Sequence, residues 1–362
     1  MQLKVLDLSR VLAGPLCAMI LGDLGARVIK VERPGSGDET RGWGPPFSSD
    51  GTAAYYLAVN RNKKSVALDL SSAGDRRVVD QLIREADVVV ENFLPGALTR
   101  LGLDRDAILS GNPSLIWCTI SGFGSDSARP GYDFVVQAES GWMSITGDPD
   151  GPPMKVGVAL ADVLAGKDAA IAILAAVSQR AFRPLSVDER RIEVSLSRSA
   201  IAALVNVAQN VLVSGEEARR WGNAHPNLVP YQLFQALDRP FVIAVGSDSQ
   251  WKACVRALGL DELARDESLA KNEGRVRQRT RVVDAISGRV RNELARHWTD
   301  RLDNAGVPCG LVRNVGEALA GVSASASTGV EPSVPGAVRL PPPHLDEHGA
   351  EIRTLGWRAF QP

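Results

Sequence analysis

Residues 3–34 read LKVLDLSRVLAGPLCAMILGDLGARVIKVERP. The runs at 3–9 and 27–34 are short and rich in Leu, Val and Ile, which is typical of buried strands. Between them, residues 11–26 have the apolar spacing of a helix. A strand, a helix and a second strand in this order predict parallel strands within one sheet.

The same alternation continues along the chain. An amphipathic run at 72–86 and a shorter one at 98–109 are expected to be helices, as is the Ala-rich second half of residues 156–181. Strands that alternate with helices favour an α/β fold, a parallel sheet covered by helices on both faces. The expected strands are residues 3–9, 27–34, 65–70, 87–93, 114–124 and 192–196.

A second unit begins after a change of composition. Residues 215–230 are rich in glycine, proline and polar residues and form a break after an expected helix over 199–215. A strand-like run at 241–247 then begins a region of helical segments that extends to about residue 300. Residues 321–336 have the Ser, Pro and Gly content of a linker.

Composition excludes several classes of protein. The 362 residues carry 41 Lys plus Arg and 42 Asp plus Glu, a net charge of −1, so we expect neither a nucleic-acid nor a membrane partner. Four separated cysteines and no HxxEH-type cluster predict no metal site. The apolar run at 171–177 is too short to span a bilayer, and no signal peptide is recognisable, so a cytoplasmic location is expected.

The common cofactor and nucleophile motifs are missing. Residues 35–40, GSGDET, begin like GxGxxG but place Thr40 at the third glycine, and residues 122–125 fail in the same way. No P-loop or GxSxG motif occurs. A nicotinamide dehydrogenase, a P-loop enzyme and an α/β-hydrolase are therefore disfavoured.

Asp162 is the first candidate for chemistry. It lies where an Ala-rich helix is expected to begin, so the helix dipole would keep its carboxylate ionised, and an ionised carboxylate can act as a nucleophile. Alternatively, Asp162 only caps the helix. Basic residues in the first unit could meet phosphates or belong to an ordinary solvated surface; they are Arg10, Arg33, Arg41, Arg61, Lys63, Lys64 and Arg100.

Longer stretches carry a family resemblance. They are VLDLSRVLAGPLCAMILGDLGARVIKVERPGSGDETRGWGPPF (5–47), NRNKKSVALDL (60–70), ADVVVENFLPGALTRLGL (86–103), GDPDGPPMKVGVALADVLAG (147–166), GNAHPNLVPYQLF (222–234) and AGVPCGLV (305–312). In this order they resemble the class III CoA-transferases, which include formyl-CoA and carnitine CoA-transferases and the related α-methylacyl-CoA racemases.

The resemblance implies a fold. A large CoA-binding, Rossmann-like domain would comprise residues 1–205 and 337–362, and a smaller α/β domain residues 225–318. Residues 206–224 and 319–336 would be linkers. Two such chains would thread through each other as an interlocked-ring homodimer.

The resemblance also implies a reaction. CoA would move from an acyl-CoA donor to an acceptor carboxylic acid, through an anhydride and then a CoA thioester on Asp162. CoA thioesters would be substrates, and no cofactor would be bound permanently. The implied CoA-binding residues are Val11, Leu12, Ala13, Arg33, Leu68, Leu70, Asn92, Phe93 and Arg100, and the implied acceptor pocket includes Tyr132 and Asp133.

Two other functions are open on the same fold. In the racemases of the family a histidine stands where this chain has Tyr132, and a neutral tyrosine is a poor acid or base for α-proton transfer near pH 7. A CoA-binding protein without catalysis is the third possibility, against which Asp162 argues. The chain departs from the family at residues 183–191, at Arg198 and in its short 319–336 segment, and it lacks a glycine-rich lid loop.

Overall fold

The computed structural model describes residues 3–320 and 338–361 of the chain. They form two compact units. Unit 1 contains residues 1–143, 155–216 and 323–362, and unit 2 contains residues 144–154 and 217–322. The expected linker at 319–336 lies outside the described residues from residue 321 onward, and the expected domain bounds stay a prediction.

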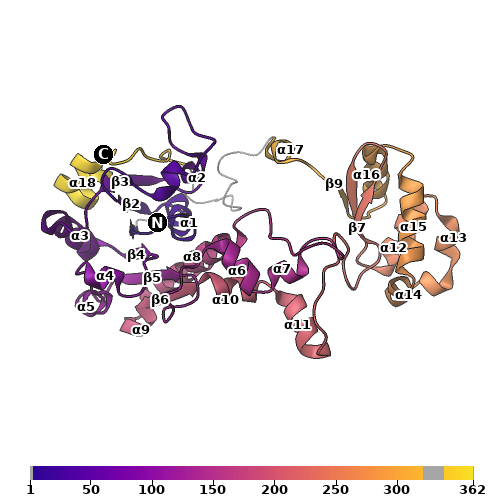
Figure 1. The fold of residues 1–362 in the computed structure, drawn as a ribbon, viewed down its shortest axis with the longest axis horizontal. Coiled ribbons are helices and arrows are strands. Elements are labelled where there is room, and N and C mark those ends of the chain that lie inside the picture. Colours follow the sequence, from indigo (N-terminus) through magenta and orange to yellow (C-terminus); the bar gives the residue numbers. More distant parts are fainter. Residues whose placement is uncertain (1–2, 321–337, 362) are drawn as a thin grey trace. The chain divides into compact units, whose positions relative to one another are not determined.

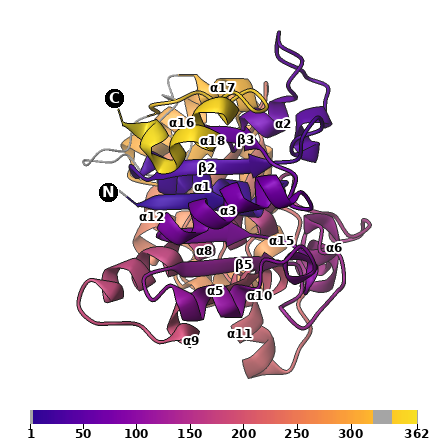
Figure 2. The same cartoon turned by 90° about the vertical axis from the view of Figure 1, so that its left-hand side faces the viewer.

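Unit 1 is built on a six-stranded parallel sheet in the order β3-β2-β1-β4-β5-β6 (Figure 2). The expected α/β fold is confirmed. The chain adds β2 and β3 on one side of β1 and then β4, β5 and β6 on the other side. The carboxyl ends of β1 and β4 therefore form a topological switch point, a position that favours ligand binding. The strands are β1 (Lys4–Asp7), β2 (Arg27–Glu32), β3 (Lys63–Ala67), β4 (Val88–Glu91), β5 (Ile116–Ser121) and β6 (Arg191–Ser195).

Helices cover both faces of this sheet, because each strand sends alternate side chains to opposite sides. Val5 packs with α1 and α8 on one face, and its neighbour Leu6 packs with α3, α5 and α18 on the other. These helices are α1 (Ala13–Asp23), α3 (Ala73–Glu85), α5 (Arg105–Gly111), α8 (Leu160–Arg180) and α18 (Gly349–Leu355). Shorter elements of this unit are η1 (Glu39–Gly42), α2 (Ala54–Leu57), α4 (Ala97–Arg100), α6 (Asp133–Glu139), α9 (Val187–Arg190) and η4 (Gly356–Phe360), while α7 (Trp142–Ile145) extends across the boundary between the units.

Two expected elements differ from the structure. The strand expected at 65–70 is β3, which begins two residues earlier, because the buried Lys63 pairs with an acid and therefore belongs to the sheet. The expected helix at 199–215 is two helices, α10 (Leu196–Ala202) and α11 (Val205–Ser214), and Val205, the first residue of α11, has a φ of 40°. No single described helix is long and apolar enough to cross a membrane; α10 and α11, bent by 69°, pass that test only as a pair, by length and composition.

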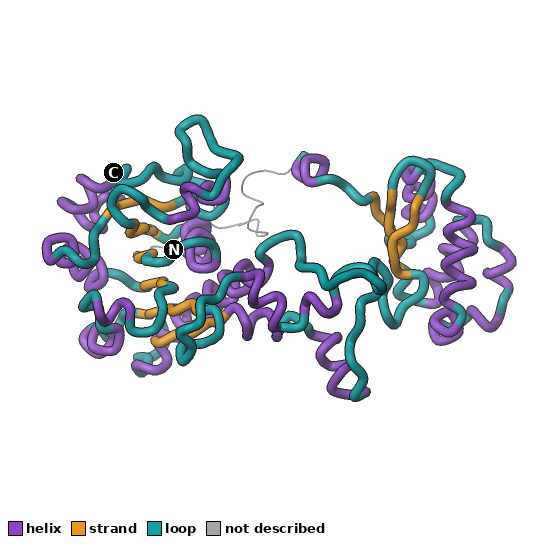
Figure 3. The backbone as a smooth tube through the Cα atoms, in the orientation of Figure 1, coloured by secondary structure: helices purple, strands orange, loops and turns teal. Residues whose placement is uncertain are grey.

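Unit 2 combines a three-stranded antiparallel sheet with a group of helices (Figures 1 and 3). The strands are β7 (Tyr231–Gln235), β8 (Pro240–Ala244) and β9 (Cys309–Leu311). Apart from Pro240, β8 lies within the strand expected at 241–247. The sequences of β7 and β9 have too little apolar periodicity to predict a strand. The core includes the fully buried Trp298. The helices are α12 (Asp248–Ala257), α13 (Asp261–Arg265), η2 (Glu267–Leu269), α14 (Asn272–Arg277), α15 (Arg279–Val290), α16 (Ala295–Asn304) and α17 (Val315–Leu319).

Candidate active site

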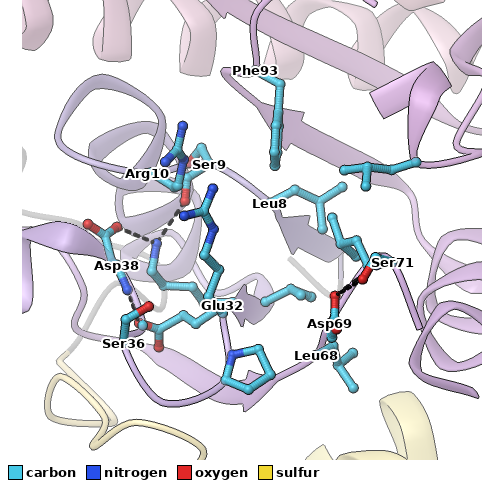
Figure 4. A pocket seen from close by; sticks show the side chains of 17 residues that line it. Leu8, Ser9, Arg10, Glu32, Ser36, Asp38, Leu68, Asp69, Ser71 and Phe93 are labelled. Carbon is cyan, nitrogen blue, oxygen red and sulfur yellow. Dashed lines mark hydrogen bonds and ion pairs between the residues drawn. The ribbon is translucent and has the colours of Figure 1, made fainter. Parts of the chain in front are cut away.

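Two adjoining cavities open at the carboxyl ends of the strands in unit 1. The first, of about 390 Å³, lies over β1, β2 and β3, and its walls include Arg33, Leu68 and Leu70 (Figure 4). The second, of about 230 Å³, contains Asp162. Arg10 and Phe93 line both cavities. The Arg10 guanidinium carbon lies 5.6 Å from the centroid of the Phe93 ring, and the two cavities adjoin at this contact.

The loop after β1 forms the floor between the cavities, and hydrogen bonds fix it on both sides. The Ser9 N–H donates to the Asp7 carboxylate at 3.0 Å. Asn92 accepts from the Arg10 N–H at 2.9 Å and donates to the Arg10 carbonyl at 2.7 Å. The loop leads into α1, whose first residue lines the second cavity, and no side chain caps the N-terminus of this helix. Backbone N–H groups at a helix N-terminus stabilise negative charge.

Asp162 lies in the first turn of α8 and lines the second cavity. The pKa of its carboxyl is raised to about 7. Burial is the largest cause, the negative charge of the nearby Asp133 is the second, and the Ala13 backbone amide acts in the opposite direction. A carboxyl group tuned to this range is typical of a catalytic position. The residue is thus an ionisable group near neutrality, with a backbone donor from α1 beside it.

Asp133 positions the start of α8. One of its carboxylate oxygens accepts from the Ala161 N–H at 2.8 Å, and the other accepts from Gln137 Nε2 at 2.6 Å. Gln137, fully buried, also accepts from the Val156 N–H at 2.8 Å. Because the Asp133 carboxylate occupies the end of the helix, α8 begins at Leu160, ahead of the expected start. The alternative interpretation of Asp162 as the cap is wrong, since residue 159 is the N-cap and makes no side-chain cap bond.

The basic residues considered as phosphate ligands separate in the structure. Lys63 is fully buried, and its ammonium contacts the Asp7 carboxylate at 2.9 Å, the Pro15 carbonyl at 2.8 Å and Asn60 Oδ1 at 2.8 Å. These partners belong to the end of β1, to α1 and to the segment before β3, so Lys63 binds together the elements that carry the site. Arg41 pairs with Glu32, Arg61 with Asp23 and Lys64 with Glu351.

The predicted ligand-binding residues fall into three groups. Val11, Leu12, Ala13, Asn92, Phe93 and Tyr132 line the second cavity with Asp162, and Arg33, Leu68, Leu70 and Phe93 line the first. Arg100 is exposed at the end of α4 and lines neither cavity, and Asp133, expected in the acceptor pocket, lines neither cavity. Their roles stay predictions.

Three residues of the site were not singled out by the sequence. Gln137 and Asp38 are buried side chains that accept hydrogen bonds from backbone N–H groups. Burial raises the pKa of the Tyr55 hydroxyl, and the Asp162 carboxylate lies close enough to raise it further. Asp38 falls within residues 35–40, where the sequence pattern shows only an incomplete nucleotide fingerprint. Among the described residues, no three His, Cys, Asp or Glu side chains form a group that could hold a metal ion.

Comparison with known proteins gives consistent matches. The family model described as "CoA-transferase family III" matches residues 1–348. The chain is 42% identical over 315 residues to succinyl-CoA:glutarate CoA-transferase of Mus musculus, covering 86% of this chain and 71% of the relative. It is also 42% identical over 326 residues to succinate–glutarate CoA-transferase of Agrobacterium fabrum, covering 88% and 81%.

A solved structure shares the fold. A CAIB/BAIF family protein from Brucella suis superposes with a TM-score of 0.85 at 39% sequence identity, and the match covers 97% of each chain.

Proposed function

The chain belongs to CoA-transferase family III, and from that membership we propose that it moves CoA between two carboxylic acids with Asp162 as the nucleophile. Membership confirms the resemblance found in the sequence. The observation that carries the proposal is the Asp162 carboxyl, with its pKa near 7, in a cavity that adjoins a second one. The succinyl-CoA and glutarate named for two relatives are the proposed donor and acceptor.

The two cavities accept the two ends of a CoA thioester. The nucleotide would occupy the first cavity, with Arg33 at its phosphates and Leu68 and Leu70 against the adenine. The pantetheine arm would pass Arg10 and Phe93. This path brings the thioester carbonyl to Asp162 in the second cavity.

The chemistry consists of carboxylate and thiolate exchanges. An Asp162 oxygen attacks the thioester carbonyl, the C–S bond breaks, and a mixed anhydride and CoA thiolate form. The thiolate then attacks the Asp162 carbonyl and expels the donor acid, which carries away an Asp162 oxygen. The acceptor carboxylate attacks the resulting aspartyl-CoA thioester and expels CoA thiolate, which leaves a second anhydride. The thiolate attacks the acceptor-derived carbonyl of this anhydride, so that the acceptor leaves as its CoA thioester and the Asp162 carboxylate is regenerated. The Ala13 amide would stabilise the developing oxyanions.

One experiment tests this route. The protein is mixed with succinyl-CoA and then with hydroxylamine, the peptides are mass-analysed, and CoA transfer to glutarate is measured in parallel. We expect a hydroxamate on the peptide containing Asp162, together with glutaryl-CoA. Exchange of the α-proton in deuterated water without CoA transfer would instead identify a racemase, and neither product would identify a CoA-binding protein.

The activity is expected to depend on pH through Asp162. The nucleophile is the ionised form, so kcat/KM for succinyl-CoA should rise with pH to a plateau above about pH 7. Asp133→Asn removes a negative charge beside it while keeping an oxygen for the Ala161 amide, so the pKa of Asp162 should fall and the acidic limb should move to lower pH. Rate profiles from pH 5 to 9 measure both, and an unmoved limb in the variant would contradict this assignment.

We also propose the interlocked homodimer implied by the family. Its support is α11, which has no buried residue and leaves Leu212 and Val213 78% and 77% exposed. An apolar helix face of this kind is expected to be covered by another chain. Light scattering should give twice the chain mass of 38.6 kDa, and a monomer at micromolar concentration would contradict the dimer. The cytoplasmic location remains a prediction from the sequence.

A further inference from the structure

Asp38 is buried beneath the loop that joins β1 to α1. It is 2% exposed, and its carboxylate contacts Lys30 Nζ at 3.0 Å and accepts from the Thr40 N–H at 3.0 Å. Burial alone would raise the pKa of Asp38, but Lys30 and Thr40 hold it below its ordinary value. The ammonium of Lys30 also donates to the Ser9 carbonyl at 2.9 Å, so the Lys30–Asp38 ion pair is hydrogen-bonded to the backbone of the loop (Figure 4).

The same carboxylate binds the strained residue of the loop. Val11 has a φ of 70°, a left-handed conformation that a β-branched residue rarely adopts. Its N–H donates to both Asp38 oxygens, at 3.4 and 3.3 Å. A strained residue persists only where its surroundings hold it, and Asp38 supplies such a bond directly to the strained backbone.

The backbone conformation of Val11 sets the direction in which the chain enters α1. Two residues later, the Ala13 amide lies close enough to the Asp162 carboxylate to lower its pKa. The carbonyl of Ala13 lies where a Cβ on Gly166 of α8 would be only 2.6 Å away, so α1 and α8 meet at backbone distance there. With so little space between the helices, a rotation at Val11 would change the relation of the Ala13 amide to Asp162.

We infer that Asp38 is a positioning residue for the transfer reaction: it holds Val11 in the left-handed conformation and thereby keeps the Ala13 amide beside Asp162. Asp38 acts through the backbone of the loop. The inference rests on the proposed function, in which this amide stabilises the oxyanions formed at Asp162.

A double-variant cycle tests the inference. Asp38→Asn keeps the size of the side chain but removes its charge, and we expect kcat to fall about 30-fold with KM for succinyl-CoA changing less than about threefold, because misplacement of a catalytic group costs up to about 100-fold. Val11→Gly alone should lower kcat about threefold through the lost cavity wall. The double variant should recover about tenfold relative to Asp38→Asn, since glycine adopts a positive φ without help.

The matched control is Asp87→Asn. Asp87, the residue before β4, pairs with Arg180 at 2.9 Å and accepts from the Lys4 N–H at 2.9 Å, so the same substitution removes a structural ion pair away from the loop. It should lower thermal stability without changing kcat. A double variant no faster than Asp38→Asn, or an Asp38→Asn variant with normal kcat, would overturn the inference. Failure of the wild type to transfer CoA would instead refute the proposed function.

Discussion

Replacement of Asp162 by Ala is expected to lower the rate of CoA transfer by about 10⁴-fold or more, with CoA binding retained. The reason is that every covalent intermediate of the proposed route forms on this carboxylate, so no other group can supply the route. The first cavity, where the nucleotide would bind, does not include Asp162, and the binding free energy of CoA should therefore change little.

The measurement pairs kcat for transfer from succinyl-CoA to glutarate with calorimetric binding of CoA. Asp168→Asn is the matched control, because Asp168 is an exposed acid on the same helix, hydrogen-bonded to Ser199 Oγ at 2.6 Å. It should keep the wild-type rate. An Asp162→Ala protein that transfers CoA within tenfold of the wild type would rule out the aspartyl route.

Lys63→Ala is expected to destabilise unit 1 by about 3–5 kcal/mol, because it removes the cation from a buried ion pair. The Asp7 carboxylate would be left with only Lys30, at 3.9 Å, as a cationic partner, and the Pro15 carbonyl would lose a donor. Burial lowers the pKa of Lys63 to about 8, against the attraction of Asp7, so the side chain remains largely protonated at pH 7.

Urea unfolding at pH 7 measures the free energy of unfolding. Lys64→Ala is the matched control, since Lys64 is the next residue of β3, pairs with the part-exposed Glu351 at 2.8 Å and donates to the Ala359 carbonyl at 2.6 Å. Its loss should cost about 1–2 kcal/mol, less than the loss of Lys63, because the Glu351 carboxylate left behind stays in contact with water. Equal destabilisation by the two substitutions would show that the buried pair contributes nothing special to the fold.

The sequence predicted the framework of unit 1 because that information is local. In residues 3–34 the apolar spacing changes from strand to helix and back to strand, and β1, α1 and β2 lie within those stretches. The prediction lost accuracy where polar residues enter the core. β3 begins at Lys63, which a hydrophobic pattern counts as outside the strand, although its partner Asp7 makes it part of the interior.

The sequence by itself determined the α/β fold, the family and Asp162 as the candidate nucleophile, since apolar periodicity and long motifs can be read along the chain. Only the tertiary structure decided what surrounds that carboxylate. Asp133 lies 29 residues and Ala13 149 residues from Asp162 in the chain, and their opposite effects on its pKa exist only once α6, α1 and α8 have packed together. Electrostatic interactions depend on distance in space and on burial, and neither can be read from sequence separation.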